Sequence, residues 1–153
     1  MIAWRIAKQE YALDRTGAGA LACAGRWHAN GVPVIYAGLS VEICTFEKLV
    51  LSGPILPKDL LLAKLVLPDD PALYEAAEVT ALPGWDASPP GRPSIDYGTQ
   101  LLRSGRRLGL IVPSAVIPEA RILVINPLHP RFASVALAVE RPFSFDTRLR
   151  SKP

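Results

Sequence analysis

The sequence has few of the residues that build metal sites or disulfides. Its 153 residues include two cysteines, Cys23 and Cys44, and two histidines, His28 and His129. The cysteines do not form a CxxC motif, and these four residues do not make up an ordinary set of zinc ligands. We therefore expect no bound metal, and we expect both cysteines to be reduced thiols.

Long apolar stretches are also lacking, although half of the residues are hydrophobic. No apolar run approaches the length of about 18 residues that a membrane-spanning helix needs. Arg5 and Lys8 interrupt the N-terminal stretch where a signal peptide would have its apolar core. The sequence therefore predicts a cytoplasmic protein that does not contact a membrane.

The basic charge is small, with a formal net charge of +3 at pH 7. Part of the excess lies in two short clusters: Arg103, Arg106 and Arg107, and the tail residues Arg148, Arg150 and Lys152. A dedicated nucleic-acid-binding protein usually has a denser basic stripe interleaved with aromatic residues. The charge therefore favours an anionic small ligand or an acidic protein surface as the partner, without direct contact to nucleic acid.

A chain of this length holds one sizeable hydrophobic core, so we expect a single domain over residues 1–153. Hydrophobic patterns predict strands at residues 3–7, 59–67, 108–112, 121–125 and 134–139, and helices at 40–52 and 94–104. Gly105 is the expected stop of the second helix. Between them, the proline-rich stretch 68–93 is predicted to be an ordered loop with one short helical piece at 74–79.

Residues 23–28 and 33–38 are predicted to form a β-hairpin. Both segments can be extended, and Asn30-Gly31 between them is a favourable turn sequence. This arrangement would place Arg26 and Tyr36 on the two arms of the hairpin, close to the helix that follows.

One carboxylate falls on the apolar face of the predicted helix 40–52, for which Ser40 is the expected N-cap. In a helical projection, four residues lie within about 60° of Glu47: Ile43, Cys44, Val50 and Leu51. A buried carboxylate is costly unless it is paired or lines a cavity. Glu47 is therefore either half of a structural ion pair, with Arg26 as the simplest partner, or a functional group.

Cys44 could instead be a catalytic nucleophile. Its predicted helix position is apolar, and no histidine lies near it in the sequence. Packing in the core is therefore the favoured interpretation of this cysteine.

A series of short motifs runs in order along the chain. These are Trp4-Arg5, Gly25-Arg26-Trp27, the segment of Tyr36, Glu47 in its helix, Val112-Pro113-Ser114-Ala115-Val116, Asn126-Pro127-x-His129-Pro130 and Phe143-x-Phe145-Asp146. Together they resemble the RES domain family, the toxins of Xre-RES toxin-antitoxin modules. The arginine, glutamate and serine that give this family its name match Arg26, Glu47 and Ser114, and His28 stands where the family usually has asparagine.

The resemblance implies an α+β fold like that of ADP-ribosyltransferases, with a bent mixed β-sheet and flanking helices. It implies that NAD is the substrate and that the bond between nicotinamide and ribose is cleaved, which is a glycosyltransferase reaction. ADP-ribose would pass to a target protein, as in a mono-ADP-ribosyltransferase, or to water or phosphate, as in an NAD hydrolase or phosphorylase. An Xre-like antitoxin that covers the active cleft is the implied partner.

The chemistry of the matched residues agrees with NAD cleavage. Glu47 can offset the positive charge of an oxocarbenium-like transition state. Arg26, with Arg5 in support, suits a diphosphate because a guanidinium pairs two oxygens at once. Tyr36 can stack on the nicotinamide ring, and Ser114 can orient Glu47 or hydrogen-bond the ribose or the carboxamide. The alternative function is a non-catalytic binding module with a basic face.

Overall fold

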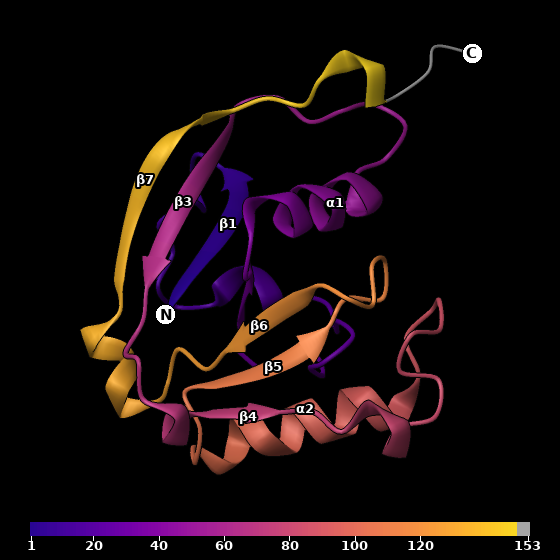
Figure 1. The fold of residues 1–153 in the computed structure, drawn as a ribbon, viewed down its shortest axis with the longest axis vertical. Helices are drawn as coiled ribbons and strands as arrows, with labels where there is room; N and C mark the ends of the chain where they lie inside the picture. The colour runs from indigo at the N-terminus through magenta and orange to yellow at the C-terminus, as the bar shows by residue number, and fades with distance from the viewer. Residues whose placement is uncertain (150–153) are drawn as a thin grey trace.

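The computed structural model describes residues 1–149, so the tail residues Arg150 and Lys152 lie outside the described part. Within it, seven strands form one mixed sheet in the order β4-β5-β6-β2-β1-β3-β7 (Figure 1). The strands are β1 (Ile2–Lys8), β2 (Ile35–Gly38), β3 (Leu60–Val66), β4 (Tyr74–Ala76), β5 (Gly109–Pro113), β6 (Arg121–Ile125) and β7 (Ala136–Phe143). The α-helices are α1 (Val41–Leu51) and α2 (Arg92–Ser104), and short 3-10 helices lie at Ala18–Ala20, Pro71–Leu73, Val79–Ala81, Pro130–Ser134 and Thr147–Leu149.

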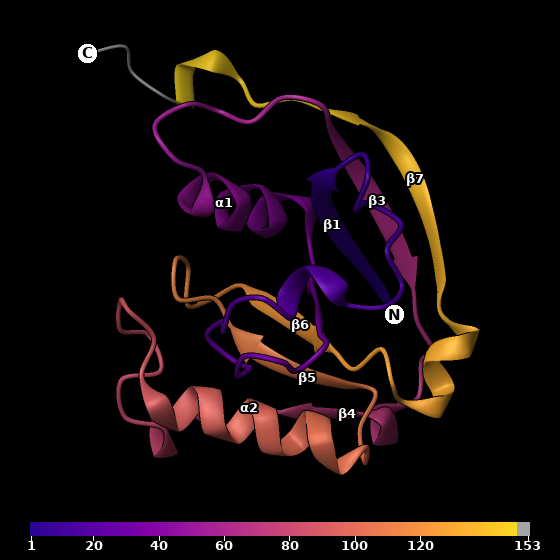
Figure 2. The same ribbon diagram turned by 180° about the vertical axis from the view of Figure 1, so that it is seen from behind.

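The sheet is divided at the junction of β1 and β2. These strands pair only through Trp4 and Gly38, whereas β1 pairs with β3 along its whole length. One half, β1-β3-β7, therefore diverges from the other half, β2-β6-β5-β4, and Figures 1 and 2 show the two halves at an angle with α1 beside the first. Only β4 and β5 are parallel. The predicted bent, mixed sheet with flanking helices is confirmed.

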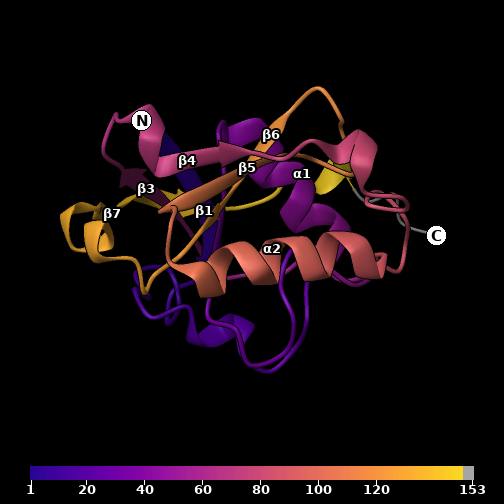
Figure 3. The same ribbon diagram turned by 90° about the horizontal axis from the view of Figure 1, so that it is seen from below.

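Each helix covers a different part of this sheet. Leu101 and Leu102 of α2 share a core with Leu110 of β5 and Val124 of β6, and Figure 3 shows α2 running along β4 and β5. Cys44 of α1 packs in a separate core with apolar residues of β1 and β3. No helix of residues 1–149 is long and apolar enough to span a membrane.

Helix α1 begins where the sequence predicts, because the Ser40 hydroxyl accepts a hydrogen bond from the Ile43 N–H at 3.3 Å. Its predicted buried face is only partly correct. Ile43 and Cys44 are buried, but Val50 and Leu51 are 59 % and 82 % exposed. Figure 1 shows the last turns of α1 extending beyond β1, and of these turns Leu49 still packs against the core shared with β1 and β3.

Two other predicted elements are wrong. Residues 23–28 do not pair with 33–38; instead Gly25 bridges His28 within a tight turn, and β2 pairs with β1 and β6. Residues 74–76 form β4 rather than a helix, because they add in parallel to the edge of β5. The strands at β1, β3, β5, β6 and β7 and the helix α2, with Gly105 at its end in a left-handed conformation, follow the prediction.

Candidate active site

The side chains of Glu47 and Ser114 meet at the end of the divided sheet. Glu47 lies on α1, and Ser114 directly follows β5. The Ser114 hydroxyl donates a hydrogen bond to Glu47 Oε1 at 2.6 Å, and Ser114 is 1 % exposed, whereas Glu47 is half-buried. This short contact holds one carboxylate oxygen in a fixed position and leaves the second without a protein donor within the described residues.

The loop after β5 fixes the direction of the Ser114 hydroxyl. Its oxygen accepts hydrogen bonds from the backbone N–H groups of Val116 and Ile117 at 3.0 and 3.1 Å. Because a serine oxygen has two lone pairs and one hydrogen, these two contacts leave only the hydrogen, which goes to Glu47. The serine is therefore a dedicated donor to the carboxylate.

Arg26 lies opposite the long loop that precedes α2. Its Nη1 donates to the backbone oxygens of Trp85 and Ala87 at 2.6 and 2.8 Å. The Trp27 and Trp85 rings, 6.4 Å apart, add an aromatic contact between the same two segments. Within residues 1–149, Arg26 Nε and Nη2 take part in no hydrogen bond or ion pair. This edge of the guanidinium is therefore available for bidentate binding of a ligand.

The charges of both Arg26 and Glu47 act on the Tyr36 hydroxyl. Burial raises the pKa of the Tyr36 hydroxyl well above its usual value. The Trp27 N–H and the Arg26 charge act in the opposite direction, and the Glu47 charge raises this pKa further. The electrostatic influence of both charged groups on one hydroxyl places Arg26, Tyr36 and Glu47 in one neighbourhood.

Helix α2 holds the Arg26 segment in place. The Thr99 hydroxyl accepts a hydrogen bond from the Ala29 N–H at 2.8 Å. Gly98 faces the backbone of Trp27 so closely that a Cβ atom at residue 98 would overlap the Trp27 carbonyl oxygen. Glycine is therefore required here for α2 to support the chain beside Arg26.

Arg5 makes its hydrogen bond to a different segment of the chain. Its Nη1 donates to the backbone oxygen of Asp14 at 3.2 Å, and burial lowers its pKa while Asp14 and Cys44 raise it. Within residues 1–149, no hydrogen bond or ion pair joins Arg5 to Arg26, Glu47 or Ser114. A hydrogen bond joins Glu47 to Ser114, and the charges of Arg26 and Glu47 both act on Tyr36, whereas Arg5, on β1, interacts with Asp14 and Cys44.

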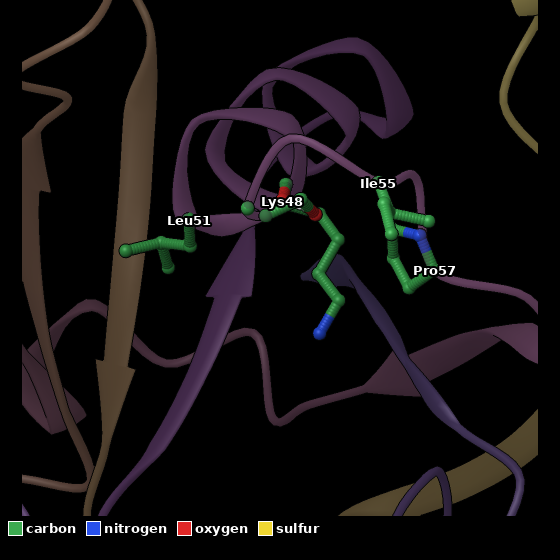
Figure 4. A pocket seen from close by; sticks show the side chains of 6 residues that line it. Lys48, Leu51, Ile55 and Pro57 are labelled. Atoms are coloured by element: carbon green, nitrogen blue, oxygen red, sulfur yellow. Dashed lines mark hydrogen bonds between the residues drawn. The ribbon is translucent and has the colours of Figure 1, made fainter.

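Lys48 is a second cation near Arg5 that the sequence analysis did not single out. Burial lowers the pKa of Lys48, and so does repulsion by Arg5 and Lys8. Lys48 lines a shallow cavity of about 180 Å³ at the end of α1, where it points away from Leu51 and Ile55 (Figure 4). Lys48 follows Cys44 by four residues, so both lie on the face of α1 that is directed towards β1, and this spacing could have been read from the sequence.

A larger cavity, of about 830 Å³, lies between residues 8–10 and 55–59. Neither of these two cavities is lined by Arg26, Tyr36, Glu47 or Ser114. The candidate site is thus formed by side chains from α1, from β2 and from the two loops that carry Arg26 and Ser114.

The contacts support neither an Arg26–Glu47 ion pair nor a catalytic Cys44. Arg26 and Glu47 form no ion pair in the described residues, since Arg26 is bound to backbone oxygens and Glu47 to Ser114. Cys44 is buried, its Sγ donates to the Trp4 carbonyl at 3.4 Å, and burial raises its pKa to about 11. Such a thiol is a packing residue and a poor nucleophile at neutral pH.

The motif that contains Asn126 and His129 has structural contacts. Asn126 Nδ2 donates a hydrogen bond at 2.9 Å to the carbonyl of Leu102, one of the last carbonyl groups of α2. His129 Nδ1 accepts from the Arg131 N–H at 3.1 Å and caps a 3-10 helix. Residues 1–149 contain no group of three or more His, Cys, Asp or Glu side chains arranged to hold a metal ion.

Comparisons with known proteins agree with this arrangement. Residues 2–146 match the RES domain. The chain is 39 % identical over 155 residues to "Prs ADP-ribosylating toxin" of Sphingobium sp. (strain YBL2), a match that covers 97 % of this chain and 96 % of the relative. It is 37 % identical over 153 residues to "Toxin Res" of Pseudomonas putida, with 97 % and 99 % covered.

A solved structure shares the fold. The crystal structure of the M. tuberculosis MbcT-MbcA toxin-antitoxin complex contains a chain that superimposes with a TM-score of 0.68 at 17 % identity. The superposition covers 92 % of this chain and 84 % of that one. The sequence match over nearly the whole chain, together with this fold, shows that the protein belongs to the RES domain family.

Proposed function

We propose that the protein is a toxin that consumes NAD by cleaving the bond between nicotinamide and ribose. The observation that carries this proposal is the Ser114–Glu47 hydrogen bond of 2.6 Å beside Arg26 and Tyr36. The proposal combines this oriented carboxylate with a guanidinium that has a free edge and with an aromatic ring on which both charges act. Relatives named as an ADP-ribosylating toxin and as Toxin Res support the assignment.

Glu47 is the proposed catalytic carboxylate. Departure of nicotinamide leaves positive charge on the ribose, and a fixed negative charge stabilises that state most strongly when it needs no reorganisation. Ser114 supplies this preorganisation by holding Oε1. The other oxygen, Oε2, is the one that would face the ribose.

Arg26 is the proposed clamp for the diphosphate. Nη1 is occupied by the loop at Trp85 and Ala87. The Nε and Nη2 edge can form two parallel hydrogen bonds with phosphate oxygens, a geometry that lysine cannot reproduce. Arg5, which is half-buried on β1, would add long-range positive charge as the supporting arginine.

Replacement of the carboxylate tests the proposal. The assay is release of free nicotinamide from NAD by the purified chain. Glu47→Gln keeps the size of the side chain and removes its charge, so turnover should fall by about two orders of magnitude or more. Glu42→Gln is the matched control, because Glu42 is an exposed acid on the same helix. No nicotinamide release by the unmodified chain would instead support a non-catalytic binding module.

The proposed acceptor of ADP-ribose is a side chain of a target protein. The name of the relative at 39 % identity, an ADP-ribosylating toxin, supports this choice over water and phosphate. Mass spectrometry of the products of NAD in buffer, in phosphate and in cell extract tests it. A protein adduct of ADP-ribose in extract is the expected result, whereas free ADP-ribose or its phosphate as the sole product would overturn it.

We further propose that an Xre-like antitoxin covers the active cleft. The solved complex with the shared fold is a toxin bound to its antitoxin, which supports a protein partner for this chain. The partner should present a carboxylate-bearing segment, because Arg26 makes the cleft positive. A complex that cleaves NAD as fast as the isolated toxin would contradict this model.

A further inference from the structure

His28 is buried beside the candidate active site and uses both of its ring nitrogens. It is 3 % exposed. Its Nε2 lies 3.1 Å from the Ala20 carbonyl oxygen and 3.0 Å from the Cys23 carbonyl oxygen, and its Nδ1 lies 2.8 Å from the Tyr36 hydroxyl. The imidazole thus joins the segment at residues 20–23 to strand β2.

These contacts determine the tautomer of His28. A carbonyl oxygen only accepts hydrogen bonds, so Nε2 must carry a hydrogen. None of the contacting groups is a carboxylate, and a buried imidazolium without one would be costly. The ring is therefore neutral, its Nδ1 has a free lone pair, and the Tyr36 O–H donates to it.

The Tyr36 hydroxyl consequently makes its hydrogen bonds to groups of the protein itself. It gives its hydrogen to His28 Nδ1 and accepts the Trp27 N–H at 3.2 Å. It therefore has no hydrogen left to donate to a ligand, which can contact the ring face or donate to the hydroxyl oxygen.

The space around this pair is closely fitted. A Cβ atom at Gly25 would lie 2.6 Å from His28 Cε1 and 3.0 Å from the Tyr36 hydroxyl oxygen. The two rings have centroids 5.5 Å apart and planes inclined by 55°. The absence of a side chain at residue 25 is what lets the two rings meet in this geometry.

We propose that His28 is a positioning residue, which fixes Tyr36 by accepting its hydroxyl hydrogen so that Tyr36 presents its ring face to the substrate and donates no hydrogen bond to it. This inference rests on the proposed NAD-cleaving function and adds a specificity element to it. A tyrosine held in this way recognises a flat aromatic ring such as nicotinamide by stacking. It does not act as a proton donor to the leaving group.

Nitrogen NMR of the wild-type protein tests the tautomer without reference to activity. The chain has two histidines, so His129→Gln assigns the two sets of ring signals. The expected result for His28 is the pattern of a neutral ring protonated at Nε2. A pattern of an Nδ1-protonated or doubly protonated ring at neutral pH would overturn the proposal, even if NAD is cleaved.

Two amide variants separate the contacts of His28. In His28→Asn, the amide oxygen can take the place of Nδ1 and still accept from Tyr36, whereas in His28→Gln the amide nitrogen takes the place of Nε2 and the acceptor is lost. We expect His28→Gln to raise the KM for NAD by about tenfold and to change kcat less. We expect His28→Asn to remain near the wild-type KM, and His129→Gln to match the wild type.

Substitutions of Tyr36 complete the test. Tyr36→Phe keeps the ring and should lose about as much as His28→Gln, and the double variant should lose little more than either alone. Tyr36→Ala removes the ring and should be far worse. The proposal would be overturned if His28→Gln raised the KM for NAD by the same factor in the wild type and in Tyr36→Phe. It would also be overturned if Tyr36→Phe abolished turnover. Absent nicotinamide release by the wild type would instead refute the proposed function, while the NMR result would stand.

Discussion

Ser114 and Glu47 are 67 residues apart in the sequence, and their side chains meet at 2.6 Å. The contact ties helix α1 to the end of strand β5. The serine hydroxyl is held by two backbone N–H groups, so it points at the carboxylate in the free protein and needs no rearrangement before a substrate binds. Preorganisation of this kind is the usual source of electrostatic catalysis.

Ser114→Ala should therefore lower kcat for NAD cleavage by about a hundredfold, because a displacement of Glu47 by about 1 Å is enough for a loss of that size. KM should change less, since Ser114 acts through Glu47. Steady-state kinetics of nicotinamide release measures both values.

Ser104→Ala is the control for this prediction. Ser104 is an exposed serine at the end of α2 whose hydroxyl donates to the Leu101 carbonyl and accepts from the backbone N–H and the Nε of Arg106. It should leave kcat at the wild-type value. If Ser114→Ala also keeps full kcat, then Glu47 does not depend on its serine partner.

Arg26→Lys should weaken NAD binding although it keeps the positive charge. Lysine cannot hold the carbonyls of Trp85 and Ala87 and a diphosphate at the same time, because it has one nitrogen in place of the fork. The expected loss is about 1.5–3 kcal/mol in binding free energy, the usual range for hydrogen bonds to charged groups. Titration calorimetry in the inactive Glu47→Gln background measures it.

Arg92→Lys provides the matched control, because Arg92 is exposed on α2 and pairs only with Asp96 at 3.6 Å. Unchanged NAD affinity in Arg26→Lys would mean that Arg26 is a structural residue of the loop. Arg5 would then be the remaining candidate for the diphosphate.

Most of the fold could be predicted from local patterns. The strands with strongly apolar runs, the Ser40 N-cap and the Gly105 stop are encoded within a few residues, so they are where the sequence predicts. The predicted hairpin at 23–38 failed for a physical reason. β2 pairs along its whole length with β6, and within residues 23–28 Gly25 bridges His28 in a tight turn, so this segment forms no ladder with β2.

The candidate site could be predicted only in part from the sequence. The resemblance to the RES family selects Arg26, Glu47 and Ser114, but the contact that orients the carboxylate joins segments 67 residues apart. The role of His28 depends on carbonyl groups of residues 20 and 23 and on Tyr36, which no local pattern brings together. The exposed end of α1 was also missed, because a helical projection shows which residues share a face and not what covers it.

Gly98→Ala should destabilise the protein, against the usual trend for a helix. Alanine in a helix interior is normally more stable than glycine by about 1 kcal/mol. Here the added Cβ would overlap the Trp27 carbonyl oxygen, so either α2 or the segment beside Arg26 must move. The expected net cost is about 1–3 kcal/mol, measured by urea unfolding.

Gly19→Ala is the comparison, since a Cβ at residue 19 would meet no atom within 4 Å. It should be neutral in stability and in nicotinamide release. A stability of Gly98→Ala equal to or above that of the wild type would show that α2 can shift away from Trp27 at no cost.

Native alkylation should distinguish the two cysteines. Cys23 is exposed, while Cys44 is buried and its pKa is raised to about 11, chiefly by burial. Only the thiolate reacts with iodoacetamide, and a raised pKa keeps Cys44 protonated at neutral pH. Mass spectrometry should therefore find one modified thiol per native chain, at Cys23, and two after denaturation in urea. The variant Cys23→Ser should remain unmodified in the native state and keep its NAD turnover. Rapid labelling of Cys44 in the native protein, with loss of turnover, would instead restore a cysteine-based mechanism as a competitor to the Glu47 mechanism.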